Sequence, residues 1–264
     1  MHFFKAHAYG NDFLYVEAGE AGARQLSALA RELCDRHTGV GADGLIVFKR
    51  TGQGASMRLF NADGGLAEVS GNGVRGLAAL LLRNDGRDGA TLTIETDAGI
   101  KRLTRTARTA GRQTFRAEMG LPRDLRHVPI EAAGERLHAV VMDFGNPQCV
   151  VLGGLPTHDT FQRLGPALER HPYFPAGTNV EFAAVEAPSR IRILIWERGV
   201  GPTQSSGTGS CASLIAAASY GGAEREADVV APGGTQRVEW HEDNVYLIGW
   251  AEVVLEGVWY RGAP

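Results

Sequence analysis

The sequence has few lysines and few cysteines among its 264 residues. None of the three lysines follows a glycine, which excludes the Gly-Lys-Ser/Thr signature of a P-loop, and none lies in a motif typical of a pyridoxal phosphate Schiff base. The three cysteines are too far apart for a Cys-x-x-Cys metal pair, and their odd number argues against a disulfide framework. These residues are Lys5, Lys49, Lys101, Cys34, Cys149 and Cys211.

Long apolar runs and an excess of one charge are also missing. No stretch approaches the ~18 apolar residues of a membrane span, and the first residues lack a charged-then-apolar signal pattern. The 27 basic residues nearly balance the 30 acidic ones, so neither nucleic acid nor an anionic membrane is an expected partner. The 8 histidines show no metal-ligand spacing. With 44% hydrophobic residues, we expect a cytoplasmic protein with a packed core in one large domain or two smaller ones.

Two similar glycine-rich turns are the most informative feature, Ser70-Gly71-Asn72-Gly73 in one half and Ser206-Gly207-Thr208-Gly209 in the other. Each precedes a run of small and apolar residues that predicts a helix. Backbone N–H groups at a helix start lack intrahelical partners and, with the helix dipole behind them, attract anions. Two such starts could hold one carboxylate from both sides, each with a hydroxyl beside it, as a two-sided proton transfer requires.

A rival interpretation is dinucleotide binding, because Gly71-x-Gly73-x-x-Gly76 fits that fingerprint and Glu95 follows about twenty residues later. Residues 39–44 fit the same pattern, so it is a weak signal in a chain with 35 glycines. The fingerprint also needs a buried strand immediately before it, whereas the polar segment 62–68 lies there. We therefore expect no nucleotide, and the glycines could equally be ordinary helix-capping residues.

Hydrophobic periodicity predicts many short strands and few helices. Helices are expected over residues 24–36 and 159–170, and from each glycine-rich turn to about residues 82 and 220. The connector 120–124 separates two halves that repeat the same order of elements. Without regular βαβ alternation, this pattern favours an α+β fold, and the repetition suggests an internal duplication with the site between the halves.

Polar residues gather at predicted strand ends. Glu197 and Arg198 end an apolar strand just before the second turn, where the carboxylate could orient or accept a proton and the guanidinium could clamp a second carboxylate. Four asparagines could be turn formers or could line a polar pocket: Asn11, Asn61, Asn146 and Asn179.

Eight segments, in order along most of the chain, together resemble the diaminopimelate epimerase family. They are residues 7–13, 39–45, 61–64, 71–75, 145–147, 177–182, 196–201 and 206–209. The resemblance implies two pseudo-symmetric α+β domains, each a curved, mostly antiparallel sheet wrapped around a central helix. We place them at residues 1–118, completed by a C-terminal strand at about 252–264, and at residues 119–251.

The resemblance also implies a cofactor-independent isomerisation at the α-carbon of a dicarboxylic amino acid, in the lysine and peptidoglycan precursor pathway. One base removes the α-proton, and an acid on the opposite face returns one. The implied partner is a small amino-acid substrate, with no metal, and a homodimer is left open. By the resemblance, Asn61, Asn179 and Arg198 hold the distal end of the substrate, Asn11 and Asn146 line the pocket, and the α-carboxylate contacts Gly71, Asn72, Gly207 and Thr208.

The reacting positions depart from the family. Its two bases are cysteines directly before the GNG and GTG turns, where this chain has Ser70 and Ser206, and a histidine usual after Asn-Pro is replaced by Gln148. Glu197, the partner of the second base position, is retained. We therefore predict Ser70, Ser206 and Glu197 as catalytic residues, with Gln148 among those that bind the substrate.

The serines carry an energetic cost. Because an alcohol has a pKa several units above the ~8.5 of a thiol, forming an alkoxide costs about 6 kcal/mol more, or about four decades in rate. Three interpretations stay open: serines introduced in the laboratory, a relative with changed chemistry such as another amino-acid isomerase or a dehydratase, and a non-catalytic amino-acid binder.

Overall fold

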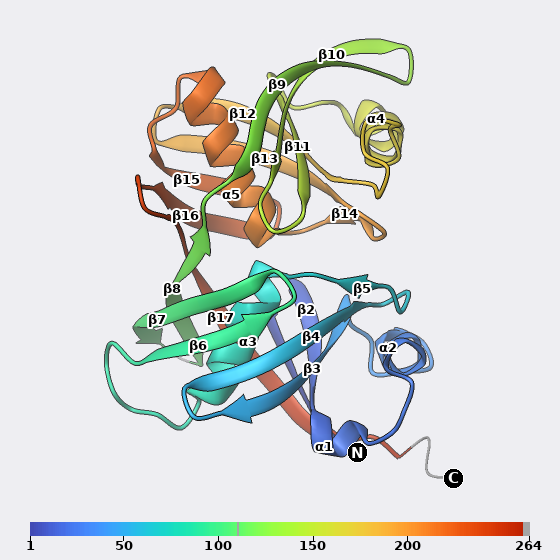
Figure 1. Ribbon diagram of the computed structural model, residues 1–264, viewed down its shortest axis with the longest axis vertical. Coiled ribbons are helices and arrows are strands. Elements are labelled where there is room, and N and C mark those ends of the chain that lie inside the picture. Colours follow the sequence, from blue (N-terminus) through green and yellow to red (C-terminus); the bar gives the residue numbers. More distant parts are fainter. Residues whose placement is uncertain (110, 261–264) are drawn as a thin grey trace. The chain divides into compact units, whose positions relative to one another are not determined.

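Figure 1 shows the computed structural model, which describes residues 1–109 and 111–260. The chain divides into two compact units. Unit 1 contains Met1–Ala117 and the chain from Trp250 onward, and unit 2 contains Glu118–Gly249. Among the helices of the described residues, none is both long and apolar enough to cross a membrane. That the units arose by duplication of one domain stays a prediction.

Eight strands of unit 1 pair in a closed ring, in the order β1, β2, β3, β4, β6, β7, β8, β17 and back to β1. The β2–β3 and β4–β6 pairs are parallel, and the short strand β5 (Leu66–Ala67) pairs with β4. The ring strands are β1 (His2–Ala8), β2 (Asn11–Glu17), β3 (Gly44–Thr51), β4 (Gly54–Asn61), β6 (Thr91–Thr96), β7 (Gly99–Thr109), β8 (Arg112–Gly120) and β17 (Val245–Val258).

Helix α3 (Gly71–Leu81) lies inside this ring, and α2 (Leu26–Cys34) packs on its outside, near the short helix α1 (Ala18–Ala21) (Figure 1). Side chains alternate along a strand, so each strand serves both layers. Leu14 and Leu45 pack in the cluster that contains α2, whereas Tyr15 and Ile46 contact the first turns of α3.

Unit 2 repeats this pattern of pairing. The run β10–β11–β12–β13–β15–β16–β17 has parallel pairs at β11–β12 and β13–β15 and antiparallel pairs elsewhere, β14 adds to β13, and β9 pairs with β10. The strands are β9 (Arg123–Ala132), β10 (Glu135–Asp143), β11 (Pro147–Leu152), β12 (Asn179–Ala187), β13 (Arg190–Glu197), β14 (Gly201–Thr203), β15 (Glu226–Ala231) and β16 (Gly234–Trp240).

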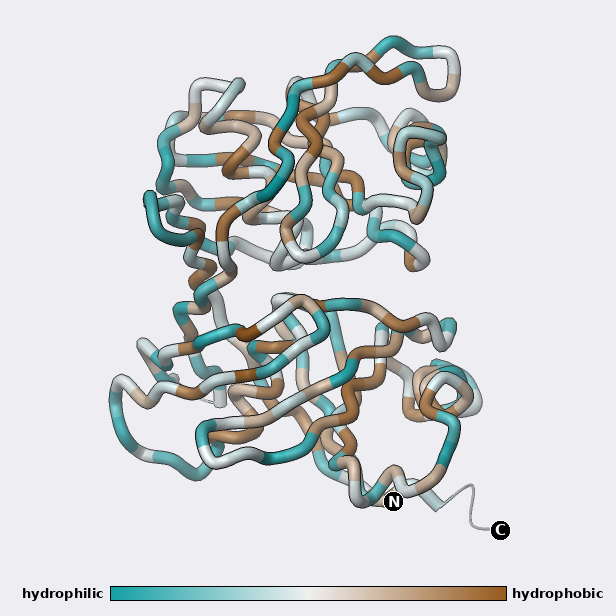
Figure 2. Tube along the Cα trace, viewed as in Figure 1, coloured by the Kyte–Doolittle hydropathy of each residue, from teal (hydrophilic) through white to brown (hydrophobic). Residues whose placement is uncertain are grey.

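The helices of unit 2 also form an inner and an outer layer. Helix α5 (Gly207–Ala216) is buried along its whole length, and a π-helical turn, Ala217–Gly221, continues it. Helix α4 (His158–Glu169) packs Phe161 and Leu164 against Val180 and Phe182 of β12. Figure 2 shows apolar and polar residues alternating along many strands, as expected for strands with one covered face and one more open face.

The observed elements confirm the α+β fold class and the expected helices. Several strands were missed from the sequence, among them β7, β9, β11 and β15. The predicted connector 120–124 is partly strand, because β9 already begins at Arg123 and pairs with β10. The helix expected to reach residue 220 ends its α-helical part at Ala216. The predicted C-terminal strand, at about 252–264, overlaps the end of β17, which stops at Val258, and residues 261–264 lie outside the described residues.

Candidate active site

Both glycine-rich turns form capped helix starts of nearly identical geometry. Ser70 precedes α3 with φ −129° and ψ 123°, and its Oγ accepts a hydrogen bond from Gly73 N at 3.1 Å. Ser206 precedes α5 with φ −133° and ψ 130°, and its Oγ accepts from Gly209 N at 3.0 Å. Serine is a favoured residue at this position because its short hydroxyl reaches the third helical amide. The first-turn amides of both helices therefore have the arrangement that binds anions.

A buried polar chain surrounds the start of α3. Asn72 Nδ2 donates to Asn11 Oδ1 at 3.1 Å, and the guanidinium of Arg75 donates to Asn72 Oδ1. Arg75 is fully buried and also lies over the ring of Tyr9, with its Cζ 5.5 Å from the ring centroid. The structure thus brings together Ser70, Asn72 and Asn11 of the predicted set and adds a positive charge close to the first turn.

Gly76 is explained by packing. A Cβ at this position would lie 2.1 Å from Tyr15 Oη, which donates to Gly73 O at 2.9 Å. Burial, and secondarily the negative charge of Asp12, raises the pKa of Tyr15 well above its ordinary value. Gly76 lies inside α3, where the tyrosine crosses the helix, so the third glycine of the nucleotide-like pattern has a structural reason.

An ion cluster, not expected from the sequence, lies behind Asn11. Arg36 contacts Asp12 and Asp43 at 2.8 Å each, and Lys5 Nζ contacts Asp12 at 2.9 Å. Asn11 Nδ2 donates to Asp43 Oδ2 at 2.8 Å. Burial acts to raise the pKa of Asp12, but hydrogen bonds from Arg36 and Lys5 outweigh it, so the pKa of Asp12 is lowered. The pKa of Asp43 is raised, by burial and by the charge of Asp12. This cluster fixes the asparagine that accepts from Asn72.

The start of α5 has an amide and hydroxyl cluster. In one orientation of the Gln148 amide, Nε2 donates to Asn146 Oδ1 at 2.6 Å and to Thr208 Oγ1 at 3.2 Å. Asn146 Nδ2 donates to the same hydroxyl at 3.4 Å. Gln148 and Thr208 are buried. Asn146 and Gln148, predicted separately, thus meet at the second residue of the helix.

Glu181 is the main residue of this cluster that sequence reasoning missed. It is fully buried on β12. A Cβ on Gly209 would lie 2.5 Å from Glu181 Oε1 and 3.0 Å from Ser206 Oγ, so both groups lie beneath the first turn of α5. Burial, and secondarily the charge of Glu197, raises the pKa of Glu181 well above its ordinary value.

Two residues of the predicted distal set meet at one end of β12. Asn179 Nδ2 donates to Pro147 O at 3.1 Å, and Asn179 Oδ1 accepts from Arg198 N at 3.0 Å. The Arg198 guanidinium donates to Ala176 O at 3.3 Å. Glu197, the last residue of β13, pairs with Gly201 of β14. These contacts hold the Arg198 backbone against Asn179, so the Arg198 guanidinium has a fixed starting point just beyond the end of β13.

Asn61 ends β4 in unit 1, opposite Gly44 of β3. Its backbone N–H donates to Gly65 O at 2.8 Å, and its carbonyl accepts from Gly64 N at 2.8 Å, which closes a tight turn. The four asparagines predicted at strand ends occupy such places: Asn11 and Asn179 begin strands, Asn61 ends one, and Asn146 directly precedes β11.

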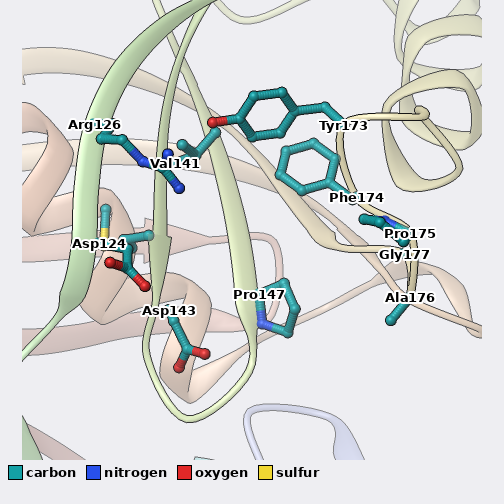
Figure 3. Close-up of a pocket in the computed structure, with 11 residues that line it drawn as sticks. Asp124, Arg126, Val141, Asp143, Pro147, Tyr173, Phe174, Pro175, Ala176 and Gly177 are labelled. Atoms are coloured by element: carbon teal, nitrogen blue, oxygen red, sulfur yellow. The ribbon is translucent and has the colours of Figure 1, made fainter.

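A cavity of about 210 Å³ adjoins this distal set within unit 2. Figure 3 shows Tyr173 and Phe174 on one side and Asp124, Arg126 and Asp143, from β9 and β10, on the other. Pro147 and Gly177 complete the rim nearest to Asn179. The cavity combines an aromatic wall with charges of both signs.

Comparison with known proteins decides the family. The family model described as diaminopimelate epimerase matches residues 3–123 and 140–254. The chain belongs to the diaminopimelate epimerase family. It is 41% identical to the diaminopimelate epimerase of Desulforudis audaxviator over 279 aligned positions, which cover 99% of this chain and 100% of that protein. It is 38% identical to the diaminopimelate epimerase of Desulfitobacterium hafniense, with 98% of each chain covered.

Solved structures show the same fold at low identity. A predicted epimerase from Pseudomonas aeruginosa matches with a TM-score of 0.76 at 14% identity, covering 99% of each chain. A probable proline racemase from Agrobacterium radiobacter, solved with bound carbonate, matches with a TM-score of 0.74 at 17% identity, covering 99% of this chain and 93% of the other. Within this fold, isomerases recur among the neighbours, which include a methylitaconate-delta-isomerase with a TM-score of 0.65 at 14% identity.

Proposed function

We propose that this protein is an isomerase of the diaminopimelate epimerase type, which inverts the α-carbon of an amino acid with two carboxylates. Family membership, with relatives named for this activity over nearly the full chain, supports the reaction. The observation that carries the proposal is the matched pair of capped helix starts, each with a hydroxyl and first-turn amides. The proposal requires one substrate molecule to meet both turns.

Substrate binding follows from the charges and donors at these positions. The α-carboxylate accepts hydrogen bonds from the amides at Gly71–Asn72 and Gly207–Thr208, where the helix dipoles favour an anion. The distal carboxylate binds the Arg198 guanidinium, which Asn179 orients through the Arg198 backbone. Asn61 contributes a further amide to the distal end. Asn11 and Asn146 keep Asn72 and Thr208 in place.

The two hydroxyls carry the proton in this proposal. One serine, as an alkoxide, accepts the α-proton, and the other donates a proton from the opposite face. The helix amide that donates to each Oγ also stabilises the negative charge of an alkoxide there. Near Ser70 the buried guanidinium of Arg75 adds to this effect. These contributions offset part of the roughly 6 kcal/mol by which an alcohol is the harder group to ionise.

The two helix starts differ in charge, which assigns unlike resting roles. A buried cation lies close to α3, whereas the carboxyl groups of Glu181 and Glu197 interact with each other near α5. The α3 start therefore favours the anionic form of Ser70, and the α5 start favours the protonated form of Ser206. Glu197 exchanges the proton of Ser206 with solvent as general base and acid.

An isotope experiment tests the proposal. LL-diaminopimelate is incubated with the protein in D2O, α-deuteration is followed by NMR, and binding of the same compound is measured by calorimetry. The proposal predicts slow deuteration with formation of the meso isomer. Binding without any deuteration at high protein concentration would contradict it and would identify an amino-acid binder. Arg192→Ala is a matched control for Arg198→Ala, since Arg192 lies on β13, the strand that Arg198 directly follows, and pairs with Glu186 at the surface.

A further inference from the structure

Glu181 is a carboxyl group in the fully buried interior of unit 2. Its neighbours in the strand, Val180 and Phe182, pack on the side of α4. Because side chains alternate along a strand, Glu181 points to the other face, where it lies beneath Gly209 at the first turn of α5. The side chain is fully buried, so it must find its hydrogen-bond partners inside the protein.

Gln148 is that partner. One end of its amide lies 3.0 Å from Glu181 Oε1 and 3.3 Å from Oε2, and the other end lies 3.2 Å from Thr208 Oγ1. Two arrangements satisfy these distances. If Glu181 is ionised, the Gln148 NH2 must face it, and Gln148 Oε1 then accepts the Thr208 hydroxyl proton. If Glu181 is protonated, its O–H can donate to Gln148 Oε1, and the NH2 donates to Asn146 and Thr208.

The surroundings favour the protonated arrangement. On the face of β12 where Glu181 lies, the titratable groups of the packed elements are Glu197 at the end of β13, the Cys211 thiol inside α5 and Tyr220 on the π-helical turn, whereas the Cys149 thiol of β11 packs on the α4 side. Tyr220 is half-exposed and stacks on His127, and α4 packs on the opposite face. Burial and the charge of Glu197 raise the pKa of Glu181, and burial raises the pKa of the Cys149 thiol, so Glu197 is the anion that acts on this carboxyl.

We propose that Glu181 is a positioning residue that keeps its proton, donates it to Gln148, and thereby holds the Gln148 NH2 toward the start of α5. In this state Thr208 Oγ1 accepts from Gln148, and the Thr208 hydroxyl proton is free to point to a carboxylate at the first turn. In the ionised state the Thr208 proton is directed to Gln148 Oε1 and is lost to the ligand. The consequence for the ligand rests on the proposed function; the coupling between Glu181 and Gln148 does not.

The first test needs no ligand. The side-chain NH2 signals of Gln148 are assigned in a ¹⁵N spectrum by their loss in Gln148→Met and are followed as the pH is raised. We expect them to shift as Glu181 ionises in the wild-type protein and to stay constant in Glu181→Gln, whose amide can donate to Gln148 Oε1 at every pH. Glu186→Gln, on the same strand but paired with surface arginines, is the matched control and should behave as the wild type.

The second test measures the dissociation constant of meso-diaminopimelate by calorimetry over the same pH range. We expect a loss of about tenfold in the wild type as Glu181 ionises, the size of one lost hydrogen bond to a charged group, and no such step in Glu181→Gln. Identical Gln148 signals and parallel affinity profiles in the two proteins would overturn the inference. Absence of ligand binding, with Gln148 signals that do depend on Glu181, would instead overturn the proposed function.

Discussion

Glu181 in unit 2 stands where Ile46 stands in unit 1. Each is the third residue of the second strand in a parallel pair, β3 after β2 and β12 after β11. Each also lies beneath the third residue of the inner helix. Ile46 Cδ1 is 2.7 Å from a Cβ built on Gly73, and Glu181 Oε1 is 2.5 Å from one built on Gly209. The two repeats therefore share their backbone pattern but differ in charge at the equivalent point. An apolar contact on one side and a carboxyl on the other give the two serines unlike surroundings.

Replacing each cap serine by the family's cysteine should raise activity and lower stability. In Ser70→Cys and Ser206→Cys we expect faster α-deuteration, up to about four decades in total, because a thiol ionises more easily. We also expect each protein to lose about 1 kcal/mol of stability, because sulfur is a poorer cap for the third helical amide. NMR exchange and chemical denaturation measure the two effects separately, and a variant more stable than the wild type would contradict the capping role.

The cap can be isolated from the chemistry with alanine. Ser206→Ala should destabilise the protein by about 1 kcal/mol, within the 0.5–2 kcal/mol range for lost caps. Ser213→Ala, seven residues further along and inside α5, is the matched control. Ser213 Oγ is buried and has no hydrogen-bond partner in the part of the chain that is described, so its removal should leave stability unchanged or slightly raised. Equal losses in the two variants, measured by urea unfolding, would show that Ser206 does not act as a cap.

Gly76→Ala should be costly because its Cβ would lie 2.1 Å from Tyr15 Oη. We expect a loss of about 1–3 kcal/mol, typical of overpacking in a tight core. Gly154→Ala is the control, since a Cβ there meets nothing within 4 Å. Adding Tyr15→Phe to Gly76→Ala should recover part of the loss by removing the colliding hydroxyl. Thermal unfolding measures these stability changes. If Gly76→Ala were as stable as the wild type, the packing explanation of this glycine would be wrong.

The free energy of unfolding should depend on pH because of Glu181. Its pKa in the folded protein is raised above the unfolded value of about 4.3, so the stability it contributes is present below that pH and is lost as the pH rises toward the folded pKa. Compared with Glu181→Gln, the wild type should therefore lose about 1.4 kcal/mol per pH unit in this window. Denaturation curves collected at several pH values measure the difference in stability between the two proteins. If that difference did not change with pH, Glu181 would be solvated and ionised, which would contradict the prediction.

Arg198→Ala should act on binding more than on chemistry. Because the guanidinium is assigned to the carboxylate that does not react, we expect a KM at least tenfold higher, with a smaller change in kcat. Arg192→Ala, on the strand β13 that Arg198 directly follows, should change neither KM nor kcat. Steady-state rates with diaminopimelate test this, and a fall in kcat at unchanged KM would move Arg198 out of the distal position.

The sequence predicted the helix starts because their signal is local. A serine followed by glycines and then by small apolar residues specifies both the cap and the helix, and the asparagines at strand ends were recognised in the same way. Glu181 was missed because Val-Glu-Phe in a strand normally exposes its middle residue. Only the placement of α5 inside the sheet buries the second face, and that depends on contacts distant in sequence. The available signal was a lone carboxyl inside an apolar strand.

Strands β7 and β9 were missed for a related reason. Both contain many charged residues, with three arginines in β7 and two in β9, and Pro129 lies within β9. Hydrophobic alternation is therefore weak, and pairing with neighbouring strands determines the conformation. The ion cluster of Lys5, Asp12, Arg36 and Asp43 joins residues from separate elements. No local pattern could have indicated it.

The most direct test of the central claim, that both serine turns act on one α-carbon, is the distribution of deuterium early in the reaction of LL-diaminopimelate in D2O. Two groups on opposite faces predict deuterium in the meso product at the inverted carbon, while the recovered LL substrate is still nearly unlabelled. Deuterium appearing equally fast in recovered substrate and product would indicate a single proton-carrying group and would contradict the account.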